Sequence, residues 1–99
     1  MEGIKSEQRP NLEELRVEID KCDKEIVQVI ARRMKLIPLV ASFKKENNLP
    51  RYQPAREKEI IENRRRLAEE LDLNPDLVEE IIKLIIKDAH RIEEDIIGS

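Results

Sequence analysis

The sequence predicts an all-α fold in which one chain forms three helices and the first helix is unusually long. Apolar residues recur at intervals of three and four along most of the chain, which is the spacing of one helix face. Pro54 and Pro75 each follow a polar residue and mark the start of a new helix. The only glycines are Gly3 and Gly98, so the hairpin turns of a β-protein find no support.

The first helix is expected from residue 12 to about residue 46. Asn11 is a suitable N-cap, with Glu14 at the spacing of a capping box, and the run Asn47-Asn48-Leu49-Pro50 ends the apolar pattern. Pro38 lies inside this range and removes one backbone hydrogen bond. Because the apolar pattern resumes in phase beyond it, we expect one kinked helix rather than two.

The second and third helices both begin at a proline. Residues 49–53 form a short connector, and Pro54 then occupies the first position of a helix that runs to about Leu71. Asn74 and Pro75 repeat the same start signal for the third helix. That helix carries an apolar face made of Val78, Ile81, Ile82, Ile85, Ile86, Ala89, Ile92 and Ile96.

The length of the first helix predicts an assembly of two chains. A helix of residues 12–46 would be about 52 Å long, whereas a compact chain of this length has a radius of gyration of about 13 Å. The two shorter helices cannot cover such a length. We therefore expect a two-fold, intertwined homodimeric helical bundle in which the long helices pack together. The alternative is a monomeric bundle in which the first helix bends at Pro38.

Composition excludes several classes of function. The chain has 99 residues and a net charge of -3 with both signs interspersed, which argues against a nucleic-acid surface, and the run Arg64-Arg65-Arg66 is expected to be mostly a solvated helix face. No apolar stretch is long enough to span a membrane. The single Cys22 and single His90 can form neither an internal disulfide nor a metal site. We expect a cytoplasmic protein with a flexible tail at residues 1–10 and one helical domain at residues 11–99.

Arg33 and Lys44 interrupt the apolar face of the first helix, which indicates a bound anion. A cation on a packed face needs an anionic partner. Eleven residues are about three helical turns, so the two side chains share a face roughly 16 Å apart and could converge on one small, multiply charged ligand. Arg16 is about 25 Å from Arg33 along the axis. In a dimer with antiparallel long helices, Arg16 of one chain can reach the site of the other, which predicts two composite sites.

Carboxylates accompany these cations on the other two helices. Arg56 and Glu57 lie in the first turn of the second helix. Glu93 follows Ala89 by one turn on a mostly apolar face of the third helix, where it supplies a charge or, if protonated, a hydrogen-bond donor. Each of these residues alone could be a solvated surface residue. Together, their spacing favours a binding site.

The ordered set of motifs resembles the all-helical class of chorismate mutases. The resemblance covers residues 12 to 96. The thirteen-residue step from Lys44 to Glu57 is its most specific part, since it joins two helices across a loop. The matching segments are Leu15-Arg16-Val17-Glu18-Ile19-Asp20 with Asp23, Ala31-Arg32-Arg33-Met34, Lys44, and Leu49-Pro50 followed by Pro54 and Arg56-Glu57.

This resemblance implies an intertwined dimer that rearranges chorismate to prephenate without a cofactor or metal. Arg33, and Arg16 from the neighbouring chain, would bind substrate carboxylate. Lys44 would bind carboxylate and the ether oxygen. Arg56 would help to hold the ring end, and Glu57 would accept a hydrogen bond from the ring hydroxyl.

Three positions depart from the family pattern. Gln53 stands where the family usually has Asp, so it keeps a helix-capping acceptor but loses a charge. Ala89 stands where some members have Ser. Glu93 stands where many members have Gln, and an ionised Glu93 could not donate a hydrogen bond to the ether oxygen. Burial favours its protonated form and nearby cations favour its ionised form, so both states stay open.

Two other functions are compatible with the same residues. Isochorismate pyruvate-lyase occurs on the same fold and resembles this chain around Arg33-Met34 and Ser42-Phe43-Lys44. The pair Arg56-Glu57 favours the mutase, because it fits recognition of the ring hydroxyl of chorismate. The second alternative is a non-catalytic dimerisation or regulatory module, which predicts solvated Arg33, Lys44 and Glu57. Association with another enzyme of the shikimate pathway also stays open.

Overall fold

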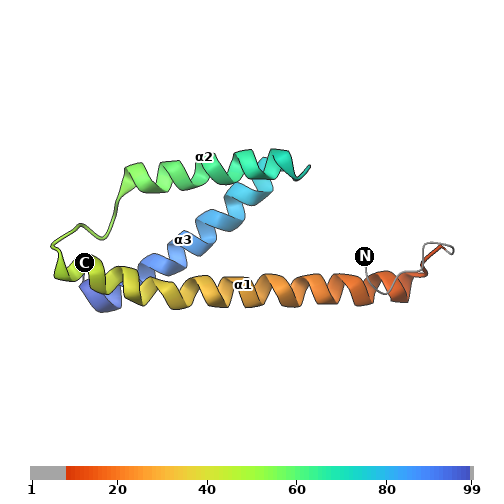
Figure 1. Ribbon diagram of the computed structural model, residues 1–99, viewed down its shortest axis with the longest axis horizontal. Coiled ribbons are helices and arrows are strands. Elements are labelled where there is room, and N and C mark those ends of the chain that lie inside the picture. Colours follow the sequence, from red (N-terminus) through yellow and green to blue (C-terminus); the bar gives the residue numbers. More distant parts are fainter. Residues whose placement is uncertain (1–8, 99) are drawn as a thin grey trace. The chain divides into compact units, whose positions relative to one another are not determined.

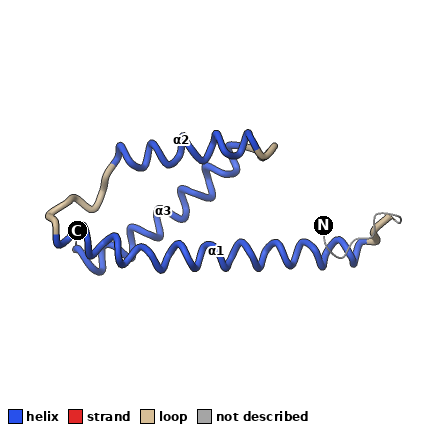
Figure 2. The backbone as a smooth tube through the Cα atoms, viewed as in Figure 1, coloured by secondary structure: helices blue, strands red, loops and turns tan. Residues whose placement is uncertain are grey.

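The structure is a computed structural model that describes residues 9–98. Within this range the chain forms three helices and no strand (Figure 2). Their bounds are Leu12–Glu46 for α1, Pro54–Glu70 for α2 and Pro75–Ile97 for α3. The predicted all-α class and the order of the helices are therefore confirmed. The expected tail, apart from its last two residues, lies outside the described part of the chain.

The chain falls into two units that divide within α1, between Arg33 and Met34. The first unit contains the helix from Leu12 to Arg33. Its start is the predicted N-cap, since the side-chain oxygen of Asn11 accepts a hydrogen bond of 2.9 Å from the backbone N–H of Glu14. Most of the large apolar residues at helical spacing in this unit are exposed, namely Leu12, Leu15, Ile19, Ile26 and Val29, while Ile30 is partly buried.

The second unit contains the rest of α1 together with α2 and α3. Residues 34–46 of α1 remain helical through Pro38, so the expectation of one helix rather than two is confirmed, while the kink stays a prediction. α3 returns alongside α2 from the turn that joins them (Figure 1). The buried apolar side chains of this unit come from all three helices: Ile37, Ala41, Ile60, Ala68 and Ala89.

The end of α1 is closed by a residue in the left-handed conformation. Asn48 has φ of 54°, and the backbone N–H of Leu49 donates to the carbonyl of Lys44 at 2.8 Å, while Asn48 N–H donates to Lys45 at 3.4 Å. This pair of bonds is a Schellman motif, which reverses the chain sharply after a helix. Asp72, with φ of 57°, closes α2 in the same way. The reversal after α1 brings the connector back beside Lys44.

The basic run at residues 64–66 has a structural role at its centre. Arg65 of α2 lies 2.9 Å from Asp76 and 3.1 Å from Glu79, both on α3. The hydrogen bond with Asp76 raises the pKa of Arg65 above its ordinary value. The expectation of a solvated face therefore needs correction at Arg65, because its guanidinium joins two helices.

None of the helices in residues 9–98 combines the length and the hydropathy that crossing a membrane requires.

Candidate active site

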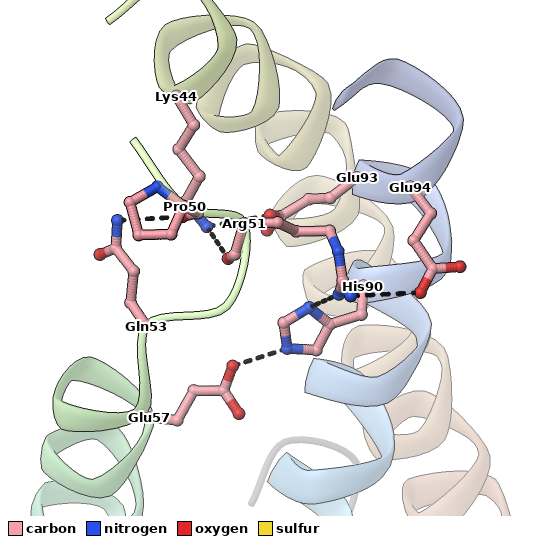
Figure 3. Close-up of polar contacts among 8 residues, drawn as sticks. All are labelled: Lys44, Pro50, Arg51, Gln53, Glu57, His90, Glu93 and Glu94. Atoms are coloured by element: carbon pink, nitrogen blue, oxygen red, sulfur yellow. Dashed lines mark hydrogen bonds and ion pairs between the residues drawn. The ribbon is translucent and has the colours of Figure 1, made fainter. Parts of the chain in front are cut away.

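Lys44 is held between the connector and α3. Its ammonium nitrogen lies 2.9 Å from Oε2 of Glu93 and 2.8 Å from the backbone carbonyl oxygen of Arg51 (Figure 3). The Schellman turn after α1 explains the second contact, since it returns the connector toward the last turn of the helix. The side chain of Lys44 is 14% exposed and that of Glu93 is 7% exposed. The structure therefore places a cation and a carboxylate together in a largely buried pair.

Glu93 satisfies the expectation of a carboxyl group on an apolar face. It is buried one turn after Ala89, which is also buried. A carboxylate in such surroundings is costly unless it is paired and hydrogen-bonded. Lys44 supplies that partner across 49 residues of sequence.

Glu57 faces His90 rather than solvent. Its Oε2 atom lies 2.6 Å from Nε2 of His90, which joins the first turn of α2 to α3. The other ring nitrogen of His90, Nδ1, lies 2.7 Å from a guanidinium nitrogen of Arg51. Arg51 is also 3.5 Å from the Glu94 carboxylate. Figure 3 shows these contacts as one continuous group.

Arg51 connects the two halves of this network. Its carbonyl oxygen accepts a hydrogen bond from Lys44, while its guanidinium group donates to His90. One connector residue thus positions the cation of α1 and the imidazole of α3 at the same time. The result is an unbroken polar path from Glu93 to Glu57 that involves all three helices.

Two hollows lie beside this path. The smaller, of about 430 Å³, has Lys44 and Gln53 on its wall together with apolar residues of α1 and Leu49. The larger, of about 1060 Å³, lies between α2 and α3 and has Glu57 and His90 at the end near the connector. Lys44 and Glu57 therefore border different hollows in the single chain.

Gln53 and Arg56 are the two predicted site residues of this unit that lie at the start of α2 and make only local contacts. The expectation that Gln53 caps α2 is wrong: its side chain makes no capping hydrogen bond and instead donates to the carbonyl of Pro50 at 3.4 Å. The shorter side chains of Asp and Asn suit a cap, whereas Gln carries one more methylene group. Arg56 is 53% exposed and pairs with Glu59 on its own helix. Its contact with a substrate stays a prediction.

Arg16 and Arg33 belong to the first unit. Arg16 is exposed and pairs with Glu13, one turn earlier in α1, at 3.0 Å. Arg33 is partly buried. Their approach to Lys44 stays a prediction, within one chain for Arg33 and across a dimer for Arg16.

Sequence reasoning missed the residues that hold Glu57. It considered His90 only as a metal ligand and passed over Arg51, Tyr52 and Glu94. The position of His90 could have indicated its role, since it lies one turn after Ile86 and three residues before Glu93, on the face that carries the candidate carboxylate.

Across residues 9–98, no group of three or more His, Cys, Asp or Glu side chains is arranged so that it could hold a metal ion.

Comparison with known proteins gives a family match over most of the chain. Residues 15–94 match the family model described as chorismate mutase type II. A chorismate mutase of Methanocaldococcus jannaschii is 33% identical over 76 residues, which are 77% of each chain. The T-protein of Enterobacter agglomerans is 35% identical over 81 residues, which are 82% of this chain. A bifunctional chorismate mutase/prephenate dehydratase of Aquifex aeolicus is 43% identical over 60 residues, or 61% of this chain. The chain spans only 22% of that T-protein and 17% of that bifunctional protein.

Proposed function

The chain belongs to the chorismate mutase type II family, and on that premise we propose that it converts chorismate to prephenate. The observation that carries the proposal is the position of Lys44. Its ammonium group is largely buried, bonded to the connector and to α3, and adjacent to a hollow of about 430 Å³. A cation in such a place suits a small anionic substrate.

The proposed reaction needs electrostatic stabilisation rather than a nucleophile. In this intramolecular Claisen rearrangement one carbon–oxygen bond breaks while one carbon–carbon bond forms, and the ether oxygen gains negative charge in the transition state. An ammonium group has three donors, and Lys44 uses two of them for Glu93 and Arg51. The third donor can bind a substrate carboxylate or the ether oxygen, where fixed charge lowers the barrier.

The remaining substrate contacts follow from the family resemblance. Arg33 binds a carboxylate, and Arg56 leaves its surface pair with Glu59 to hold the ring end. Glu57 accepts a hydrogen bond from the ring hydroxyl. Gln53 borders the site, while Ala89 contributes space. Glu93 assists when protonated, because only then can it donate a hydrogen bond to the ether oxygen.

The proposal includes a homodimer in which each site receives Arg16 from the neighbouring chain. The exposed apolar residues between Leu12 and Val29 support it, since such a row on one helix is typical of a surface that another chain covers. Arg16 on the same stretch is exposed and has a short-range partner that a substrate carboxylate could replace. We further propose the cytoplasm as the compartment, which the lone Cys22 also favours.

The alternatives differ in what they demand of the same residues. A non-catalytic dimerisation or regulatory module predicts solvated Lys44 and Glu57, but their side chains are only 14% and 28% exposed. Isochorismate pyruvate-lyase uses a similar arrangement of cations. The mutase is favoured over it by Glu57, whose carboxylate suits the ring hydroxyl of chorismate.

Product identification tests the proposal. The purified protein is incubated separately with chorismate and with isochorismate, and the products are separated and identified by mass and ultraviolet spectra. We expect prephenate from chorismate and no release of pyruvate from isochorismate. Pyruvate from isochorismate without prephenate from chorismate would identify the lyase, and no turnover of either compound would favour the non-catalytic module.

A further inference from the structure

His90 has no place among the substrate contacts proposed above, yet it makes a short hydrogen bond with Glu57, one of the residues proposed to bind the substrate. Its Nε2 atom lies 2.6 Å from the Glu57 carboxylate, across 33 residues of sequence. Both side chains are largely removed from solvent, with His90 20% and Glu57 28% exposed. A hydrogen bond in this environment restrains a carboxylate more than the same bond would at the surface.

The contacts of His90 determine which ring nitrogen carries the hydrogen. A guanidinium group can only donate, so Nδ1 of His90 must accept from Arg51, 2.7 Å away. The hydrogen then lies on Nε2, where it is donated to Glu57. The ring of Tyr52 packs edge-on against the imidazole, with 6.0 Å between ring centroids. Arg51 and Tyr52, which are adjacent in the connector, therefore fix both the tautomer and the orientation of His90.

The hydrogen bond with His90 restrains Glu57 but leaves its carboxylate able to accept a further hydrogen bond. A carboxylate has two oxygens that each accept hydrogen bonds, and His90 engages Oε2 only. Oε1 remains able to accept a hydroxyl group. A Glu side chain has several rotatable bonds, so holding one oxygen reduces the conformational freedom that substrate binding must otherwise remove.

We propose that His90 is a positioning residue that orients Glu57 toward the substrate hydroxyl, and that Arg51 sets the tautomer of His90 for this task. The inference rests on the proposed function. It assigns catalytic importance to a connector residue and an imidazole that contact no substrate atom themselves. It also explains why the connector ties Lys44 and Glu57 into one network through a single residue.

A set of variants tests this role. His90→Ala is expected to lower kcat/KM for chorismate about tenfold, because a displaced carboxylate weakens both binding and orientation. His90→Gln, which can place an N–H near the same point, is expected to restore activity to within about threefold of the parent, whereas His90→Phe is not. Arg91→Ala is the matched control, since Arg91 is the next residue, is exposed and pairs with Asp88 on the same helix.

The decisive comparison places His90→Ala in a Glu57→Ala background. If His90 acts through Glu57, the second substitution changes kcat/KM less than about twofold. The positioning role would be overturned if the double variant lost kcat/KM by the product of the losses in His90→Ala and Glu57→Ala. Equal activity of His90→Gln and His90→Phe would also overturn it. Circular dichroism and Tm of every variant identify any loss that comes from unfolding.

A measurement on the ring itself separates this inference from the proposed function. ¹⁵N chemical shifts of His90 are expected to show the Nε2–H tautomer in the parent and a mixture of tautomers in Arg51→Ala. If the parent protein makes no prephenate, the proposed function is wrong, whatever the ¹⁵N chemical shifts of His90 are. A parent that makes prephenate but shows Nδ1–H or a tautomer mixture at His90 overturns the role of Arg51 alone.

Discussion

The two units of the chain differ in how their candidate site residues pair their charges. In the first unit, Arg16 pairs with Glu13 on its own helix, and apolar residues from Leu12 to Val29 are exposed. In the second unit, Lys44 pairs with α3 and Glu57 pairs with His90 across two helices. The second unit therefore pairs these site residues between elements, although it also exposes large apolar residues such as Leu39 and Phe43. The first unit exposes an apolar helix surface of the kind that a second copy of the chain would cover in the proposed dimer.

The largest expected effect concerns the second unit. Lys44→Ala is expected to lower kcat/KM by at least about a thousandfold, because it removes the ammonium group that we propose binds the ether oxygen. Lys45→Ala is the matched control, since the neighbouring lysine is exposed and donates to the backbone carbonyl of Ile96. Steady-state kinetics with chorismate compare the two variants.

Stability must be separated from catalysis in this comparison. Lys44→Ala leaves Glu93 buried without its cation, which destabilises the fold by about 3–5 kcal/mol in comparable buried pairs. The double variant Lys44→Ala/Glu93→Gln removes that charge and is expected to regain Tm while staying inactive. A double variant with parental activity would contradict the role given to Lys44.

The next effect tests whether the first unit serves the site of a second chain. Arg16→Ala alone is expected to lower kcat/KM about a hundredfold. When Arg16→Ala and Lys44→Ala chains are unfolded together and refolded in equal amounts, half of the dimers contain one chain of each kind, and one of their two sites is intact. The mixture should recover about one quarter of the parental activity. No recovery, with mixed dimers shown by mass spectrometry, would contradict a composite site.

Glu93→Gln should change the pH dependence of the second unit's site. If Glu93 assists only when protonated, parental activity is expected to increase toward acidic pH. The Gln variant donates at every pH and should show a flat profile. Asp95→Asn, at a neighbouring exposed position, is the control and should follow the parent. A flat parental profile would show that protonation of Glu93 does not limit the reaction.

Local patterns in the sequence were sufficient to predict the helices. Periodicity, the caps at Asn11 and Asn74, and the prolines at the starts of α2 and α3 act within a few residues of each boundary. They also predicted a carboxylate at Glu93 on an apolar face. The prediction of a cap at Gln53 was wrong. It rested on the amide oxygen as an acceptor and left out the length of the Gln side chain.

The network around Glu57 could not be predicted in the same way. Arg51 meets His90 across 39 residues, and this contact depends on how the Schellman turn at Asn48 directs the connector. Helical spacing places His90 on a face of α3 but does not say which residue of another element meets it. Contacts of this kind arise from tertiary packing, which periodicity within one helix does not encode.

The smallest expected effect compares the ion pairs of one acidic residue from each unit. In the second unit, the hydrogen bond from Lys83, followed by the charges of Lys83 and Arg65, holds the pKa of Glu79 below its ordinary value. Because the folded state favours ionised Glu79, this stabilisation is complete above the ordinary pKa and is lost as pH falls through the lowered one. Glu79→Gln should therefore lower Tm by a few degrees at neutral pH and by nothing in strong acid. Glu13→Gln, which breaks the short-range pair with Arg16 in the first unit, should leave Tm unchanged at both pH values. Equal effects of the two substitutions in thermal melts would show that the pairs of Glu79 with Lys83 and Arg65 stabilise this chain no more than the single pair of Glu13 with Arg16.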